Sequence, residues 1–203
     1  GVSDEGQIDA ILQNLGTSGV KATFFINGST SQSALDKIVA AGHEIGNQAN
    51  SSSIVTGITA EQLAAEVILT EDAVINAGGS SKPYFRAPGG LSNATVLETV
   101  GSLGYGYTIG WSIDPWDWSG NSASEITSIV TSQLTPGAII LLDAGSTATG
   151  TPAALLDIIA QARALGYDFA TISSLLAWEG YYPEEPILTG PSQLFNQVNT
   201  DQK

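Results

Sequence analysis

Short apolar runs alternate with stretches of helical periodicity along most of the chain. Ile8, Ile11, Leu12 and Leu15 recur at the spacing of one helix face. The apolar runs are nearly continuous, as in strands that are covered on both faces. We therefore predict strands over residues 21–26, 44–49, 84–87, 107–113, 138–143 and 169–172, and helices over residues 7–15, 33–41, 60–77, 94–103, 124–134 and 152–165.

A glycine follows five of the predicted helices, at a position where the backbone often adopts a positive φ. The alternation itself implies a parallel sheet with helices outside, either an open doubly wound sheet or a closed barrel. Residues 1–3 suit the end of one more strand, so we expect the first strand to be truncated. The glycines concerned are Gly16, Gly42, Gly78, Gly104 and Gly166.

No charge run or Ser/Pro-rich linker divides the chain, which predicts one domain over residues 1–179. Residues 180–203 carry Pro183, Pro186 and Pro191 and show little periodicity. We expect them to form a C-terminal tail packed on the domain. A tail strand over residues 194–198 is one way to fill the space of the truncated first strand.

Composition excludes several classes of function. Lys and Arg total 6 against 20 Asp and Glu, a net charge of -14, which repels nucleic acid and anionic membrane surfaces. The chain has no cysteine and one histidine, His43, so it has no thiolate metal site and no pair of histidines. His43 precedes a predicted strand, where we expect a structural role at a helix-to-strand turn.

Acidic, aromatic and amide side chains follow several predicted strands. In βα folds, ligands bind at the carboxyl ends of the strands, so these side chains are candidates for one site. Each carboxylate taken alone also suits a helix cap, and each tryptophan also suits packing under a loop. Together, acids beside flat aromatic rings favour a sugar-binding surface. The residues are Asp4, Glu5, Gln48, Arg86, Asp114, Trp116, Asp117, Trp118 and Asp143.

Five segments carry a family resemblance: VKATFFING over residues 20–28, AGHEIGN over 41–47, FRAPGG over 85–90, DPWDW over 114–118 and PGAIILL over 136–142. In this order and spacing they resemble the polysaccharide deacetylases, the NodB-homology group of carbohydrate esterase family 4, over about residues 1–176. The resemblance implies an irregular (β/α)7 barrel.

The resemblance also implies a chemistry. Such proteins remove N-acetyl groups from chitin, peptidoglycan or related glycans, or O-acetyl groups from xylan. A divalent metal, usually zinc, is held by one Asp and two His, while a second Asp is the base and a third His protonates the leaving group.

This chain departs from the family pattern at the metal site. The family motif T-F-D-D-G reads Val2 to Gly6 here, which places Asp4 on the catalytic base and Glu5 on the metal carboxylate. Gln48 and Ser52 occupy the two metal-histidine positions. An amide and a hydroxyl are poor zinc ligands beside imidazole, so the resemblance implies at most a weak calcium or magnesium site and no other cofactor.

The later motifs, around Arg86, Asp114 and Leu141, match the family pattern at more positions. Arg86 would hold Asp4 in its ionised form, and the N–H of Gly89, where an aromatic residue is usual, would help bind the oxyanion. Asp143 replaces the acid histidine, and its pKa would have to rise for it to donate a proton. The remaining carried-over positions are Asp114, which would tune the acid, and Trp118, Leu141 and Asp117 as substrate-binding residues.

These departures predict a deacetylase-like protein that lacks zinc-dependent activity and still binds a polysaccharide or oligosaccharide of the chitin, chitosan or xylan type. The acidic groove favours cationic, partly deacetylated chains. One alternative is an active carbohydrate hydrolase with a non-standard acidic or metal site, and another is a structural or assembly protein. The sequons at Asn27, Asn50 and Asn93, with the family resemblance, suit a secreted or cell-surface protein.

Overall fold

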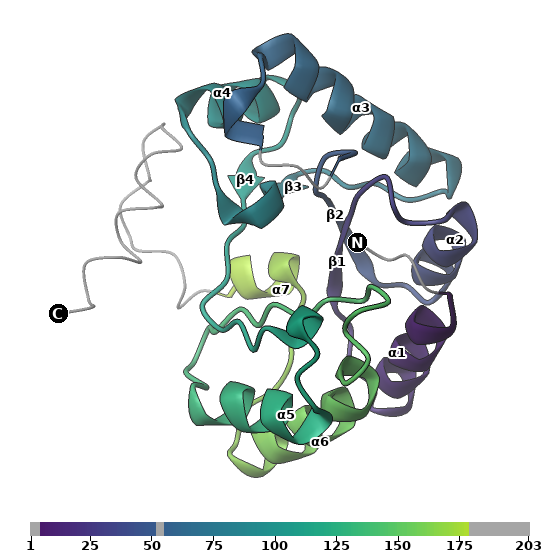
Figure 1. Cartoon of the computed structure of the whole chain (residues 1–203), viewed down its shortest axis with the longest axis vertical. Helices are drawn as coiled ribbons and strands as arrows, with labels where there is room; N and C mark the ends of the chain where they lie inside the picture. The colour runs from purple at the N-terminus through teal and green to yellow at the C-terminus, as the bar shows by residue number, and fades with distance from the viewer. Residues whose placement is uncertain (1–4, 52–54, 179–203) are drawn as a thin grey trace, which may run out of the picture.

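A computed structural model describes residues 5–51 and 55–178, and its centre is a parallel sheet (Figure 1). The strands are β1 (Thr23–Ile26), β2 (Glu44–Asn47), β3 (Tyr84–Phe85) and β4 (Tyr107–Thr108). They lie in the order β1-β2-β3-β4, so each strand pairs with its neighbour in sequence. All three pairings are parallel, which places the carboxyl ends of the strands on one side of the sheet.

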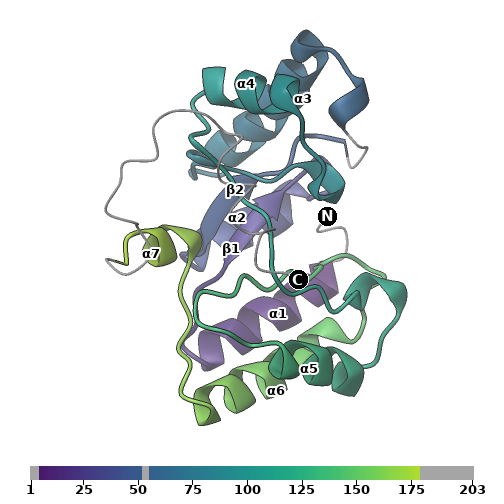
Figure 2. The same cartoon turned by 90° about the vertical axis from the view of Figure 1, so that its left-hand side faces the viewer.

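Helices connect the strands and cover the sheet. Figures 1 and 2 show α3 and α4 together at one end of the molecule and α1, α5 and α6 at the other, with the sheet between them. In chain order the helices are α1 (Glu5–Thr17), α2 (Gln32–Ala40), α3 (Ala60–Asn76), α4 (Ala94–Ser102), α5 (Ala123–Ser132), α6 (Thr151–Ala164) and α7 (Ile172–Leu176). Short 3-10 turns, η1 to η3, span Val55–Gly57, Pro88–Gly90 and Asp117–Ser119.

Local side-chain caps start several helices. Thr59 and Ser122 each form a capping box, with Gln62 and Glu125 respectively, at the starts of α3 and α5. These reciprocal hydrogen bonds satisfy backbone N–H groups that have no partner inside the helix. Each of the predicted helices is present, with ends that differ from the prediction by at most two residues.

The strand predictions after β4 are only partly confirmed. Predicted strands 107–113 and 138–143 meet in one isolated parallel bridge, between Ile113 and Ile140. The predicted strand 169–172 is wrong, because the Thr171 hydroxyl accepts a hydrogen bond from Ser174 and caps α7. The truncated first strand and the tail, with its candidate strand 194–198, lie outside the described residues.

The glycine predictions hold at four of the five helix ends. Gly42, Gly78, Gly104 and Gly166 have φ between 69° and 92°, as expected of residues that follow a helix. Gly16 was predicted to end the first helix, but α1 continues past it to Thr17. Within the described part of the chain, no helix is both long and apolar enough to cross a membrane.

Apolar side chains fill the space between the sheet and its helices. Phe85 of β3 is fully buried in a cluster with residues of α3 and α4, including Leu63 and Val100. A second cluster joins Ile26 of β1 to α2 and to Val74 of α3. Both clusters pack strand residues against helices and so fix the helices relative to the sheet.

His43 has the structural role predicted for it. The ring is buried, its Nδ1 accepts a hydrogen bond from the N–H of Ala22 at 3.2 Å, and it packs edge-on against Phe24. Burial, and to a smaller extent the charge of Lys21, lower its pKa to about 4. The folded protein therefore holds His43 neutral at pH values where the unfolded chain protonates it.

We predict that acidification from pH 6.5 to pH 5 destabilises the protein partly through His43. Only the unfolded state takes up this proton in that range, so the free energy of unfolding falls by about 1.4 kcal/mol per pH unit at most. Urea unfolding at both pH values, with His43→Gln as comparison, measures the effect. The variant keeps an acceptor but does not titrate, so an equal pH-dependent loss in both proteins contradicts the prediction.

Candidate functional site

The predicted site residues that the structure describes follow consecutive parallel segments. Gln48 comes directly after β2, Arg86 directly after β3, and Asp114 directly after the bridge residue Ile113. Asp143 lies three residues beyond Ile140, the other bridge residue. Asp4 and Ser52 lie outside the described residues, as does the side chain of Glu5.

These residues lie at the carboxyl ends of the parallel segments, which we call the strand-end face. Arg86 is a cation of this face and is almost fully buried. Its Nε and Nη2 donate to the carbonyl oxygens of Ile109 and Gly110, each at 3.2 Å. The guanidinium carbon lies 3.9 Å from the centre of the Phe25 ring and 5.6 Å from that of Trp111. Burial lowers the pKa of Arg86 to about 10, so it remains charged at neutral pH. Its role toward Asp4 stays a prediction.

The chain turns sharply after Gln48. The Gln48 N–H donates to the carbonyl of Ile26 at 2.7 Å, which extends the pairing of β1 and β2 by one residue. Ala49 then adopts a φ of 60°, which a residue with a Cβ rarely does. The side chain of Asn47 accepts a hydrogen bond from the Ala49 N–H at 2.8 Å and holds this conformation.

Asp117 joins two segments of the face through a buried carboxylate. Its Oδ2 accepts from the N–H of Asp143 at 2.8 Å and from the Thr151 hydroxyl at 2.6 Å, and its Oδ1 accepts from the N–H of Trp118 at 3.1 Å. Burial raises the pKa of the Asp117 carboxyl above its usual value, while these donors favour its ionised form. We predicted Asp117 as a substrate-binding residue, and the structure gives it a role in holding the loop.

The neighbouring tryptophans are exposed. Trp116 is 62% and Trp118 is 54% accessible, on the turn that Asp117 anchors. Asp114 accepts a hydrogen bond from the N–H of Trp116 at 2.9 Å, which supports the left-handed φ of 51° at that residue. The two indoles therefore sit on a loop fixed by two carboxylates.

The remaining predicted residues frame this loop. The Leu141 N–H donates to the carbonyl of Ile113 at 2.9 Å, and the Asp143 carboxylate accepts from the N–H of Gly145 at 2.6 Å. Gly89 lies in the 3-10 turn η2 with a φ of 64°, which glycine adopts without steric cost. We predicted that Asp114 would tune the acid at position 143. In the structure the Asp117 carboxylate accepts from the N–H of Asp143, whereas the Asp114 carboxylate accepts from the N–H of Trp116.

The donors present do not fit a zinc site. The family positions supply one carboxylate, from Glu5, with the amide of Gln48 and the hydroxyl of Ser52. Over residues 5–51 and 55–178, no group of three or more His, Cys, Asp or Glu side chains is placed to hold a metal ion. A weak oxygen-liganded divalent ion stays a prediction.

Three residues of the face were not predicted from the sequence. Phe25 and Trp111 flank the Arg86 guanidinium, and Thr151 donates to Asp117 across 34 residues. Trp111 also explains Gly90, because a Cβ there would lie 2.7 Å from the indole. Phe25 stands in a quoted motif, but nothing local marks its contact with a residue two strands away.

The chain matches the family model described as polysaccharide deacetylase over residues 3–108, more than half of its length. This chain belongs to the polysaccharide deacetylase family. Together with the likeness to solved structures below, the match confirms both the family and the fold class that the motifs predicted.

Bacterial deacetylases are its relatives in sequence. A peptidoglycan-N-acetylglucosamine deacetylase of Bacillus cereus is 30% identical over 81% of this chain and 62% of the relative. A chitooligosaccharide deacetylase of Bradyrhizobium is 31% identical over 66% of the chain and 63% of the relative. A bifunctional xylanase/xylan deacetylase of Cellvibrio japonicus is 33% identical over 61% of the chain and 18% of the relative. The chain thus spans less than two thirds of these relatives.

Solved structures of the family include an esterase and a pseudoenzyme. A family 4 carbohydrate esterase from Streptomyces lividans, in complex with acetate, is 27% identical with a TM-score of 0.77, over 83% of this chain and 88% of that one. A family 4 pseudoenzyme from Bacillus anthracis is 26% identical with a TM-score of 0.78, over 84% of this chain and 60% of that one. A mutant of that pseudoenzyme with restored enzymatic activity has also been solved.

We predict that Asp117→Asn destabilises the protein by about 1–3 kcal/mol. The amide turns an N–H₂ toward one of the donors that the carboxylate now accepts, which leaves buried groups unpaired. Urea unfolding at pH 7 measures the loss. Asp114→Asn is the matched control, because its side chain can still accept from the Trp116 N–H. Equal stability of the two variants would count against the anchoring role of Asp117.

Proposed function

We propose that this family member binds a glycan at the carboxyl ends of its strands and does not catalyse zinc-dependent deacetylation. The observation that carries the proposal is the donor set. Gln48 directly follows β2, where the family motif places a metal histidine. Ser52 stands at the position of the second metal histidine, and Glu5 at that of the metal aspartate. The pseudoenzyme of Bacillus anthracis supports the proposal, because it shows that this fold occurs without activity.

Two further features support glycan binding. Trp116 and Trp118 present exposed indoles beside the strand ends, and a flat ring packs well against the face of a pyranose. The loop that carries them is anchored through Asp114 and Asp117, so little backbone freedom would be lost on binding. The net charge of -14 favours glycans with free amino groups.

We also propose that the protein acts outside the cytoplasm, on a secreted or surface glycan. The sequons do not contribute equally to this proposal. Asn27 is buried and its side-chain oxygen accepts from Ser29, whereas Asn93 is exposed at the start of α4. Peptide mapping of the protein secreted by its own source would find any glycan at Asn93 and none at Asn27.

We predict no acetate release from N-acetylglucosamine pentamer or acetylated xylan with zinc, with cobalt or without metal. The fourfold variant Glu5→Asp, Gln48→His, Ser52→His, Asp143→His rebuilds the family pattern and should release acetate with zinc. Adding Asp4→Asn to that variant is the control and should abolish the release. Acetate release by the unaltered protein, lost in Asp4→Asn alone, would overturn the proposal in favour of an active hydrolase with a non-standard site.

We predict that Trp118→Ala weakens binding of a partly deacetylated chitosan oligomer about tenfold, because it removes the stacking surface. Isothermal titration at low and high salt measures this, and binding should weaken as salt rises. Trp178→Ala is the matched control, since that indole is 61% accessible after α7. If the unaltered protein binds neither this oligomer nor its acetylated form nor xylan, the glycan-binding proposal fails.

A further inference from the structure

A network of buried polar side chains runs from Glu71 of α3 to the turn after β2. Glu71 of α3 accepts hydrogen bonds through its Oε2 from the hydroxyls of Ser81 and Tyr105, the latter at 2.8 Å. The Tyr105 hydroxyl in turn accepts from the Nδ2 of Asn47 at 2.9 Å. Asn47 and Ser81 are fully buried, and Tyr105 and Glu71 are 3% and 9% accessible.

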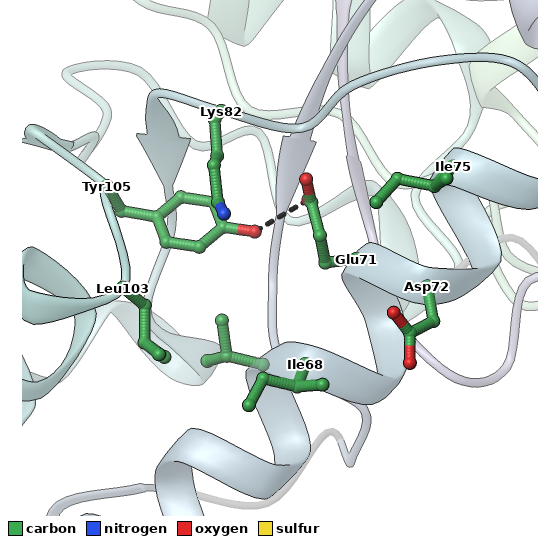
Figure 3. Close-up of a pocket in the computed structure, with 8 residues that line it drawn as sticks. Ile68, Glu71, Asp72, Ile75, Lys82, Leu103 and Tyr105 are labelled. Atoms are coloured by element: carbon green, nitrogen blue, oxygen red, sulfur yellow. Dashed lines mark hydrogen bonds between the residues drawn. The ribbon is translucent and has the colours of Figure 1, made fainter.

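At Glu71 and Tyr105 this network of side chains borders a pocket of about 210 Å³ (Figure 3). Figure 3 shows the Tyr105 hydroxyl directed at the Glu71 carboxylate, with the Lys82 ammonium beside the ring. That ammonium lies 5.7 Å from the ring centre. Burial raises the pKa of Tyr105 above its usual value, so the phenol keeps its proton and remains a donor to Glu71.

These contacts determine which way the Asn47 amide points. Its Nδ2 donates both to Tyr105 and to the carbonyl of Val67, at 2.9 Å each. Exchanging the oxygen and nitrogen of the amide would set an acceptor against the Val67 carbonyl and a donor against the Ala49 N–H. The side-chain oxygen therefore faces Ala49, where it accepts the hydrogen bond from the backbone N–H at 2.8 Å.

The other end of the network is a strained turn next to the proposed site. Ala49 has a φ of 60°, which is unfavourable for a residue with a Cβ and persists only where neighbours enforce it. Gln48 precedes it, and Asn50 follows it with its carbonyl accepting from the N–H of Gly28 at 2.8 Å. The path of the chain over residues 48–50 is thus held by the Asn47 hydrogen bond together with the backbone bonds of Gln48 and Asn50.

We propose that Tyr105 and Glu71 are remote positioning residues, which fix the turn at residues 48–50 through Asn47. Neither side chain belongs to the motifs assigned to the site, and both act on it only through hydrogen bonds. The consequence for ligand affinity rests on the proposed glycan binding. The consequence for the conformation of Ala49 does not depend on it.

Tyr105→Phe tests this by removing one hydroxyl while retaining the ring that packs on Phe85. Amide hydrogen exchange followed by NMR should show the Ala49 N–H exchanging at least tenfold faster, and by a larger factor than the N–H of Val130 in the core of α5. Affinity for the chitosan oligomer should fall at least threefold. Tyr167→Phe is the matched control, because that hydroxyl donates to the carbonyl of Leu134, and both quantities should stay unchanged.

The outcomes separate the two proposals. If the unaltered protein binds no glycan, the proposed function fails, and the exchange rate at Ala49 still decides the positioning role. If Tyr105→Phe folds and the exchange of the Ala49 N–H rises by no larger factor than that of the Val130 N–H, the positioning role is wrong. If Tyr105→Phe does not fold, Glu71→Leu replaces it. Leucine at position 71 accepts from neither the Ser81 nor the Tyr105 hydroxyl, so Ala49 exchange should rise, and an unchanged rate overturns the inference.

Discussion

The parallel pairing of consecutive strands is the constraint on which this site depends. Each strand is followed by a helix that returns the chain to the other end of the sheet, so the residue after every strand reaches the same face. The strands are short, with two residues each in β3 and β4, so the ladder of backbone hydrogen bonds ends where the residues of the site begin. Most of what positions the functional side chains must therefore come from polar contacts beyond the strands.

Three buried polar side chains provide those contacts, each by binding backbone groups. Arg86 donates to two carbonyls after β4, Asp117 accepts from two N–H groups, and Asn47 accepts from Ala49. A buried polar group without partners would cost several kcal/mol, so each of these residues holds one conformation of the loops around it. The exposed indoles of Trp116 and Trp118 are presented by loops whose backbone is thereby fixed.

Local signals in the sequence predicted the helices, because apolar spacing and helix-ending glycines act within a few residues. The glycines after α2, α3, α4 and α6 are signals of this kind. The strand over 169–172 was mispredicted because an apolar run of that length suits either structure, and the Thr171 cap decided the matter. The motifs predicted the family and the site positions, including Gln48 and Arg86, through resemblance rather than through periodicity.

Contacts between distant segments could not be predicted in this way. Asn47 and Tyr105 are 58 residues apart, and Asp117 and Thr151 are 34 apart. Each of these four residue types has an ordinary local explanation, as a strand end, a packed aromatic, a cap or a helix start. Only the fold brings the partners together, so their part in shaping the site emerges from the structure alone.

The same contacts bear on the proposal that this chain lacks the metal ligands of its family. The Arg86 guanidinium is satisfied by carbonyls and aromatic rings, and the Asp117 carboxylate by a hydroxyl and backbone N–H groups. Both buried charges therefore have protein partners among the described residues. Replacing histidine by glutamine at position 48 then changes the ligand chemistry of the face while the loops around it keep the hydrogen bonds that hold them. A face held in this way keeps its shape whatever side chain stands at position 48, and glycan binding there is the use proposed for it.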